Sequence, residues 1–511
     1  MRHDGSVIGA RREEADAEAG ARRLGPSLLA RLPEAVRRPA YDRSALSAGI
    51  AHIGVGAFHR CHQAEYTDDL LQQRFDRWGI VGVNIRPPTL TDTIGRQGGL
   101  YTRLLRSGSA VDARVIGSIV SVVDSQDSPS PALDVLASPE IDLVTLTVTE
   151  KGYCHRPSTG ELDFDAPDIA HDLANPEAPR SLPGLIVRAL EQRRATHGQP
   201  LTVMSCDNIP SNGAILSRVV GALAERRDNR LAEWIAANAA FPSTMVDRIV
   251  PATSQADHDT VEQSLGFRDE AVVAGEPFRQ WVIETRFAGR FPRWDLVGAS
   301  FVEDVAPFEL LKMRVLNAAQ STLAPLGVLA RLDYTCDDMA DPVLSGFVRR
   351  MLLEESVPTL PPVPGIAPER YVEQSLDRLR NTAIRHRNHQ IATDGSQKIV
   401  QRLLNPIRER LARGEGAALL AVPVAAWIAY VAFSSERLGR RWLVADPFAD
   451  QIAAIATRIG GDAPALAAAI LSIDAIFDGE LAASIPFRTA VAEGLRAFLS
   501  DDPRAYVRGF L

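Results

Sequence analysis

Residues 49–60 read GIAHIGVGAFHR, a short apolar run that ends in two glycines. The pattern predicts a β-strand that leads into a turn at Gly54 and Gly56 and then into a helix. Such a turn suits a pyrophosphate, because the first glycine permits a tight turn and the second lets the ligand approach the backbone. His59 stands where the usual third glycine would be. The segment alone is therefore weak evidence for a dinucleotide site, and an ordinary strand–helix turn stays open.

Similar apolar runs, rich in β-branched residues, follow this segment at 78–85, 142–148, 200–206 and 244–251. Helical stretches such as 184–194 lie between them. Near-continuous apolar strands that alternate with helices predict a parallel sheet buried on both faces. The run at 78–85 would be the second strand, and its end is where such folds contact the cofactor ribose. Asn84 would bind the hydroxyls of NAD there, and Arg86 would meet the 2′-phosphate of NADP or stay solvated.

The composition changes after about residue 298. Segments rich in Ala, Leu and Arg, separated by Pro and Gly, predict helices over 306–330, 342–356, 366–385, 396–413, 416–438, 446–458 and 463–473. We therefore expect an α/β chain with three parts. These are an N-terminal extension, partly flexible (1–45), a domain built on the parallel sheet (46–298) and an all-α domain (299–511).

Composition argues against several classes of protein. A net charge of -8 and an aromatic content of 6% suit nucleic-acid binding poorly. Four widely spaced cysteines argue against a disulfide scaffold or a cysteine-rich zinc site, and they fit a reducing, cytoplasmic location. The N-terminus lacks the apolar core of a secretory signal. The uncharged stretch 416–433 is nearly long enough to span a membrane, but its alanines and Pro423 favour a buried helix.

Lysine occurs only at Lys151, Lys312 and Lys398, although the chain has 56 basic residues. These positions are candidates for sites where arginine cannot replace lysine, with survival by chance as the alternative. Arginine stays protonated, whereas a buried lysine can lose its proton and act as an acid or base. Each of the three lysines therefore marks a segment of possible chemical importance.

The second of these lysines lies in a predicted helix, VAPFELLKMRVLNAAQSTLAPLG (305–327). At about 100° per residue, Asn317 and Gln320 fall on the same broad face as Lys312. We expect the apolar surroundings to lower the pKa of Lys312, as a general base requires. Asn317 would donate to an oxygen on which negative charge develops. The alternative is a solvated helix face on which Glu309 and Lys312 form an ion pair.

Together these segments resemble the mannitol dehydrogenase family of polyol-specific long-chain dehydrogenases. The resemblance rests on GVGAFHRCHQAEYTDDLL (54–71), TVTEKGY (147–153), SCDNIPSNG (205–213), VDRIVP (246–251), KMRVLN (312–317) and DGSQK (394–398). It implies a Rossmann-type NAD(P)-binding domain and an all-α substrate domain, with the active site in a cleft between them. It also implies metal-independent hydride transfer at a secondary alcohol carbon, of the fructuronate–mannonate or fructose–mannitol type.

The resemblance further implies a role for each matching residue. Lys312 would be the general acid/base, and Asn208 and Asn317 would hold the reacting oxygen. Glu309 would gate proton passage to the lysine. Substrate contacts would come from Asp247, Gln320, Gln390 and Lys398. Besides Asn84 and Arg86, cofactor contacts would come from Gly54, Gly56, Phe58, Arg60 and Lys151.

Two positions depart from the family pattern. Gln320 stands where the family usually has a histidine, and Gln390 where it usually has an arginine. Both amides still donate and accept hydrogen bonds. They indicate an altered substrate, weakened activity or an NAD(H)-binding paralogue without turnover. We expect NAD as the cofactor, with NADP also open, and a polyol, ketose or sugar acid as the ligand. We expect no nucleic-acid or membrane partner, and a monomer or weak homo-oligomer.

Overall fold

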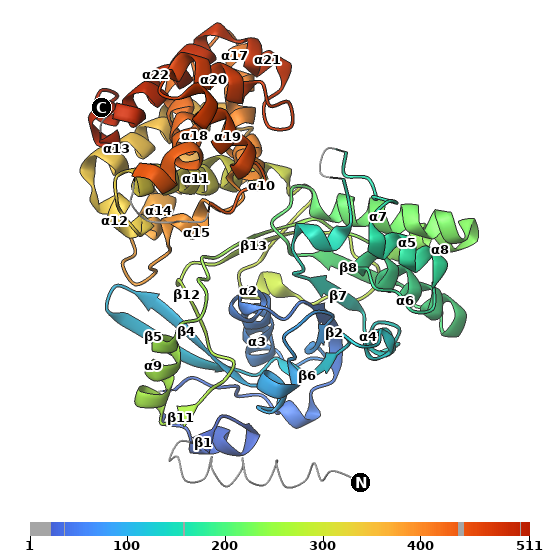
Figure 1. Cartoon of the computed structure of the whole chain (residues 1–511). Coiled ribbons are helices and arrows are strands. Elements are labelled where there is room, and N and C mark those ends of the chain that lie inside the picture. Colours follow the sequence, from blue (N-terminus) through green and yellow to red (C-terminus); the bar gives the residue numbers. More distant parts are fainter. Residues whose placement is uncertain (1–21, 35, 157–158, 438–443, 501) are drawn as a thin grey trace, which may run out of the picture. The chain divides into compact units, whose positions relative to one another are not determined.

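The structure, a computed structural model, describes residues 22–34, 36–156, 159–437, 444–500 and 502–511. They form two compact units, which divide between Val305 and Ala306 (Figure 1). We call them unit 1 and unit 2. Of the expected N-terminal extension, residues 1–21 lie outside the described residues. From Leu24 onward the chain packs into unit 1, where Leu24, Leu32 and Val36 are buried.

A parallel sheet organises unit 1. In spatial order its six strands in the described part of the chain are β6 (Ile119–Asp124), β3 (Gly79–Asn84), β2 (Ala48–Ile53), β7 (Leu143–Leu146), β8 (Leu201–Ser205) and β9 (Ala239–Ala240). All neighbouring pairs are parallel. In chain order this is 3-2-1-4-5-6, the strand order of the Rossmann fold. The expected fold class is thus confirmed.

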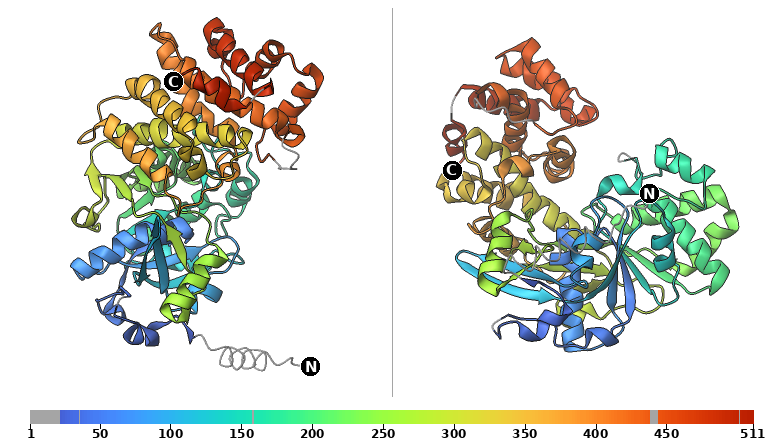
Figure 2. Two further views of the ribbon diagram at one scale, coloured as in Figure 1. Left: turned by 90° about the vertical axis from the view of Figure 1, so that its left-hand side faces the viewer. Right: turned by 60° about the horizontal axis from the view of Figure 1, so that its bottom comes forward.

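Helices cover both faces of this sheet, which explains its uninterrupted apolar runs (Figure 2). One face packs against α4 (Ser130–Leu136), α6 (Leu182–Thr196) and α7 (Asn212–Arg227) in a large buried cluster. The other face packs against α3 (Gln63–Gln73) and a second layer of short strands. All six residues of β3 are buried as a result.

One predicted strand belongs elsewhere. The run at 244–251 forms β10 (Thr244–Asp247), which pairs antiparallel with β13 (Gln280–Glu284), outside the parallel sheet. Only residues 241–243 connect β9 to β10, whereas a parallel crossover needs about a dozen residues. The short connection therefore rules out the expected placement. β13 also pairs with β14 (Ser300–Val302), so unit 1 extends past residue 298.

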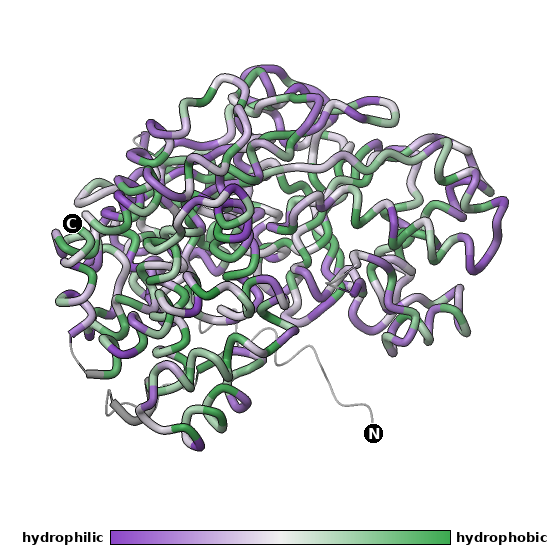
Figure 3. Tube along the Cα trace, turned by 90° about the horizontal axis from the view of Figure 1, so that it is seen from above, coloured by the Kyte–Doolittle hydropathy of each residue, from purple (hydrophilic) through white to green (hydrophobic). Residues whose placement is uncertain are grey.

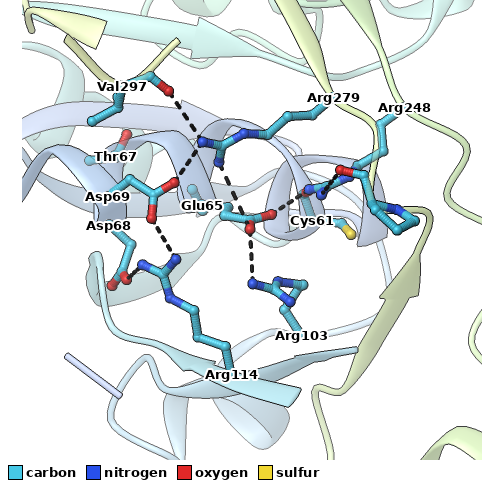
Figure 4. A network of polar contacts seen from close by, with 12 residues as sticks. Cys61, Glu65, Thr67, Asp68, Asp69, Arg103, Arg114, Arg248, Arg279 and Val297 are labelled. Atoms are coloured by element: carbon cyan, nitrogen blue, oxygen red, sulfur yellow. Dashed lines mark hydrogen bonds and ion pairs between the residues drawn. The ribbon is translucent and has the colours of Figure 1, made fainter. Parts of the chain in front are cut away.

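A hairpin that the sequence did not reveal is inserted between β3 and β6. It consists of β4 (Tyr101–Ser107) and β5 (Ala110–Ile116), with β12 (Val273–Gly275) parallel to β4. Buried ion pairs fasten it to α3 (Figure 4). Glu65 pairs with Arg103 at 3.0 Å and with Arg248, and Arg279 lies 3.8 Å away. Burial alone would raise the pKa of Glu65, but the three guanidinium groups lower it to about 2.

Apart from one isolated β-bridge, between Tyr334 and Arg387, the regular secondary structure in the described part of unit 2 is helical, as expected. Its longest helix, α18 (Ala418–Arg437), is surrounded by α11 (Ala318–Leu329), α19 (Ala449–Ile459) and α22 (Ile485–Ser500). Most of the uncharged stretch around Pro423 lies inside α18, where residues 419–431 are buried. A helix that is apolar on all sides belongs in a protein core. No helix among the described residues meets the length and hydropathy needed to cross a membrane. Apolar and polar stretches alternate along the chain (Figure 3).

The remaining helices of unit 2 complete the layers around this core. They include α10 (Ala306–Lys312), α12 (Thr335–Ala340), α13 (Pro342–Met351), α14 (Pro368–Leu379), α15 (Asn388–Ile391), α16 (Gly395–Ile399), α17 (Asn405–Ala412), α20 (Ala463–Leu471), α21 (Gly479–Ala483) and α23 (Pro503–Arg508). Three segments of this unit, among its described residues, are π-helical: η6 (Met313–Asn317), η7 (Leu352–Ser356) and η9 (Val400–Leu404). π-turns often occur at functional sites, and one of these, η6, carries Asn317 of the candidate site.

Candidate active site

The glycine turn lies at the carboxyl end of β2, beside β7, where the strand order reverses. This switch point is where doubly wound sheets bind their ligands. Gly54 has a φ of +92°, and a Cβ there would lie 2.2 Å from the carbonyl oxygen of Thr147, so the fold itself requires glycine. Gly56 is exposed, and a Cβ there would meet only the Gly54 carbonyl oxygen, at 3.9 Å. The second glycine thus leaves open space where a ligand can approach the backbone.

Phe58 and Arg60, the other predicted cofactor contacts of this segment, lie in α2 (Ala57–Cys61). Phe58 stacks on His62, with ring centroids 5.0 Å apart. Arg60 donates through Nε to the Gly56 carbonyl at 3.3 Å and through Nη1 to the Ala271 carbonyl. The arginine therefore supports the turn from the protein side, and its contact to a cofactor stays a prediction.

Asn84 ends β3, next to β2 in the sheet, and its side chain is buried. Its amide nitrogen donates to the Pro88 carbonyl at 2.8 Å and to Asp124 Oδ1 at 2.7 Å. Both amide hydrogens are thus used, which leaves the side-chain oxygen as an acceptor. Arg86 is 71% exposed and lies 3.3 Å from Asp168, a surface ion pair worth little energy.

Lys151 and Asn208 follow β7 and β8, two neighbouring strands, and both are exposed at the carboxyl edge of the sheet. Asp207 holds the two loops together. It accepts from the backbone N–H groups of Val148 and Thr149 at 3.1 and 2.9 Å. Burial raises the pKa of Asp207, and the Tyr153 hydroxyl donates to it at 2.7 Å.

Backbone strain gathers in the same loops. Thr149, Cys154 and Ser211 all have φ between +50° and +68°, a region that side chains disfavour. Such strain is often retained at functional sites. Asp207 and Tyr153 were not predicted as site residues, although they lie in the SCDN segment and the TEKGY segment, respectively, which carry the resemblance. Only their place within these segments could have identified them from the sequence.

Asp247, the last residue of β10, is buried. It lies opposite Gln280 of β13, whose carbonyl accepts from Nε2 of His62 at 2.9 Å. Burial lowers the pKa of His62 to about 3, against a smaller opposing effect of the Gln280 carbonyl and of the Asp247 carboxylate. Asp247 therefore lies near the helix that follows the glycine turn.

The lysine helix of unit 2 is interrupted by a π-turn. Lys312 ends α10, η6 follows at once, and Asn317 ends η6 before α11 begins. Lys312 and Asn317 are 8% and 5% exposed, whereas Glu309 and Gln320 are half-buried. The extra residue of the π-turn changes the angles expected for a regular helix. When its oxygen is oriented toward the Arg402 guanidinium, the Asn317 amide donates from its nitrogen to the Lys312 carbonyl at 3.3 Å, which links these two residues.

Lys398 and Gln390 lie in a neighbouring part of unit 2. The Lys398 ammonium donates to the carbonyls of Ile391, at 3.1 Å, and of Thr393, at the end of α15. Gln390 is exposed on α15. Asp394, at the start of the DGSQK segment, has a φ of +53°. The ammonium thus stabilises this strained connection, and a substrate contact of Lys398 stays a prediction.

The predicted residues therefore form two sets. Unit 1 carries the glycine turn, Asn84, Lys151, Asn208 and Asp247, and unit 2 carries Lys312, Asn317 and the residues around them. Among the residues that the structure describes, no group of three or more His, Cys, Asp or Glu side chains is placed to hold a metal ion.

Two family models match the chain in succession. The mannitol dehydrogenase Rossmann domain matches residues 48–296, and the mannitol dehydrogenase C-terminal domain matches residues 304–499. The chain belongs to the mannitol dehydrogenase family. This confirms the family that the sequence motifs indicated. As a member of the mannitol dehydrogenase family, the protein is an oxidoreductase of the polyol and sugar-acid class.

Relatives within the mannitol dehydrogenase family align along nearly the whole chain. D-mannonate oxidoreductase of Escherichia coli is 40% identical over 89% of this chain and 94% of its own length. Mannitol 2-dehydrogenase of Phaeosphaeria nodorum is 35% identical over 92% of this chain and 82% of its own. A solved structure of Pseudomonas fluorescens mannitol 2-dehydrogenase, a ternary complex with NAD and D-mannitol, is 35% identical. It covers 96% of this chain and 99% of that one, with a TM-score of 0.86.

Proposed function

We propose that this protein transfers hydride between NAD and a secondary alcohol or ketone carbon of a small polyol or sugar acid. The substrate pair is of the mannonate–fructuronate or mannitol–fructose type. One observation carries the proposal: the Gly54–Gly56 turn lies at the switch point of a Rossmann sheet, in a chain that the mannitol dehydrogenase models match along both domains. The relatives named for mannonate and for mannitol support the two substrate types.

The residues around the turn fit a dinucleotide, and the end of β3 favours NAD. The buried Asn84 amide has both its hydrogens engaged and presents an acceptor. An acceptor suits the hydroxyl of an NAD ribose, whereas a 2′-phosphate needs donors. Gly54, Gly56, Phe58, Arg60 and Lys151 would hold the rest of the cofactor. Bound NAD would accept the hydride in oxidation and return it in reduction.

In this proposal Lys312 takes the proton from the reacting hydroxyl and gives it back in the reverse direction. Asn317, beside it, and Asn208 donate to the oxygen on which negative charge develops, which stabilises the transition state. Glu309, one turn before the lysine, passes the proton onward. We propose that these groups act without a metal ion, because a lysine side chain and two amides together supply the proton transfer and the stabilisation of the oxyanion.

Asp247, Gln320, Gln390 and Lys398 would contact the rest of the substrate. The two glutamines also favour a second candidate function, an NAD(H)-binding paralogue with an altered substrate or weak activity. Gln320 and Gln390 replace the histidine and the arginine that the family usually has at these positions. A neutral amide binds a carboxylate less strongly than an arginine does, because it lacks the charge and the bidentate geometry.

The test is oxidation of NADH and NADPH by the purified protein, with D-fructose and D-fructuronate side by side. Turnover of either ketone establishes the dehydrogenase and selects the substrate type. Binding of NADH without turnover of either ketone, or of a wider set of ketoses and uronates, supports the paralogue instead. Gln320→His and Gln390→Arg would then be expected to restore turnover, with Gln192→His on α6 as the control.

A further inference from the structure

The carbonyl oxygen of Gly54 accepts several hydrogen bonds at the base of the glycine turn. The Gly56 N–H donates to it at 2.7 Å, and the Thr147 hydroxyl donates at 2.6 Å. Nε2 of His52 lies 3.1 Å from the same oxygen and 2.9 Å from Thr147 Oγ1. His52 belongs to β2, and Thr147 follows β7. Side chains from both strands at the switch point therefore fasten the turn to the sheet.

These contacts fix the tautomer of His52. A carbonyl oxygen only accepts, so Nε2 carries the hydrogen and donates. Nδ1 then accepts from the hydroxyl of Thr145 at 2.7 Å, and Thr145 is the residue paired with His52 across β2 and β7. Burial lowers the pKa of His52 to about 3. The ring is therefore neutral at physiological pH, with one defined donor directed at the turn.

His59 occupies the position of the usual third glycine and packs against His52. Its ring stacks on that of His52, with centroids 3.4 Å apart and planes within 11°. Neither of its ring nitrogens has a hydrogen-bond partner among the described residues. Its contribution to the turn is therefore stacking, which keeps the plane of the His52 ring in place.

The turn needs this support because of its own glycine. Glycine adopts many backbone conformations at little cost, so the peptide that follows Gly54 is free to reorient unless its carbonyl is held. The N–H of Gly56 is bound to the same oxygen. A change at this carbonyl would thus also move the exposed glycine that a ligand approaches.

We propose that His52 is a positioning residue for the dinucleotide. It holds the Gly54 carbonyl, together with Thr147, and so keeps the turn in the conformation that binds the cofactor. This inference rests on the proposed NAD-dependent function. It assigns a role to a fully buried histidine, which would act on the cofactor only through the turn.

The experiment measures the NADH dissociation constant of the full-length protein by fluorescence titration, with thermal unfolding in parallel. His52→Leu and Thr147→Val each remove a donor to the Gly54 carbonyl. His52→Gln keeps a donor at the position of Nε2. The control is His197→Leu, since Nε2 of His197 also contacts a backbone carbonyl in unit 1, that of Ala137 at 2.9 Å, but outside the turn.

We expect His52→Leu and Thr147→Val to raise the NADH dissociation constant about fivefold to tenfold, the effect of one hydrogen bond. The KM for the ketone at saturating NADH should stay unchanged, and His52→Gln and His197→Leu should bind NADH like the wild type. The inference is overturned if folded His52→Leu and Thr147→Val bind NADH as tightly as the wild type. It is also overturned if His52→Gln binds NADH as weakly as His52→Leu. If His52→Leu does not fold, the NADH dissociation constants of Thr147→Val and His52→Gln test the inference. A wild type that does not bind NADH instead overturns the proposed function, and this inference with it.

Discussion

The guanidinium of Arg402 faces the side-chain amide of Asn317 and selects the orientation in which the amide oxygen accepts from Nη2, at 3.3 Å. Its Nη1 reaches the backbone carbonyl of Asn317 at 3.4 Å and the hydroxyl of Ser321 at 3.1 Å. Arg402 is itself buried in the π-helical segment η9. The arginine thus fixes which end of the amide is the acceptor. The amide nitrogen, with one hydrogen on the Lys312 carbonyl, has a second hydrogen to offer to a substrate oxygen.

Replacement of Arg402 should therefore impair turnover through Asn317. We expect Arg402→Met to lower kcat about tenfold, less than the 100-fold or more typical for loss of an oxyanion donor, because the amide remains but is less well oriented. Arg402→Lys should recover part of kcat, and the KM for NADH should not change. Steady-state kinetics measure both. Arg408→Met, which removes an ion pair with Asp478, is the control, and an equal loss of kcat in that variant would contradict the assignment.

Two substitutions of Lys312 separate proton transfer from charge. Lys312→Ala should lower kcat by at least about 100-fold, as expected for loss of a general acid/base. Lys312→Arg should be impaired to a similar extent, because arginine keeps the positive charge but does not release its proton. The kcat of both variants, measured with saturating NADH and ketone, distinguishes the two roles. Near wild-type kcat in Lys312→Arg would show that only the charge matters.

The preference between the two nicotinamide cofactors should depend on Asn84 and Arg86. We expect the wild type to have a higher kcat/KM with NADH than with NADPH, because the buried amide presents an acceptor at the end of β3. Arg86→Gln should leave the KM for NADH unchanged and raise the KM for NADPH, because Arg86 is the exposed cation beside this position. A variant that loses affinity for both cofactors equally would contradict this division of roles.

Asp338 should make the stability of unit 2 depend on pH. Asn388 donates to its Oδ1 at 2.9 Å, Oδ2 has no hydrogen-bond partner among the described residues, and burial raises its pKa to about 8. An unfolded aspartate has a pKa of about 3.9, so between about pH 4 and pH 8 the folded state holds a proton that the unfolded state has lost. The free energy of unfolding should therefore fall as pH rises through this range, by up to about 1.4 kcal/mol per pH unit.

Asp338→Asn keeps this side chain uncharged at every pH. The unfolding temperature of the variant relative to that of the wild type should increase as pH rises from 4 to about 8, and the difference should be smallest at the acid end. Thermal unfolding of both proteins at several pH values measures this difference. Asp377→Asn, at an exposed position on α14, should show no such trend. A constant difference between Asp338→Asn and the wild type would place the pKa of Asp338 near its ordinary value.

The sequence predicts β2, β3, β7 and β8 because each is an apolar run buried on both faces. It did not reveal where β10 belongs, since hydrophobicity reports burial and not the partner of a strand. The β4–β5 hairpin was also missed, because it is held to α3 by ion pairs such as Glu65 with Arg103, distant in sequence. The same limit applies to Arg402. Nothing near Asn317 in the sequence identifies the arginine that contacts it.

The widened turn at Met313–Asn317 also determines which changes of the gene this helix tolerates. A π-turn contains one residue more than the α-helical turn it replaces. Loss of a single codon there would convert the π-turn into a regular α-helical turn, and the residues after it would keep their present orientation. Lys312 and Asn317 would then be separated by one residue fewer, which would disturb the contact between the Asn317 amide and the Lys312 carbonyl. Evolution can therefore exchange residue types in this segment more easily than it can shorten it, and the length of the segment should be preserved even where its letters differ.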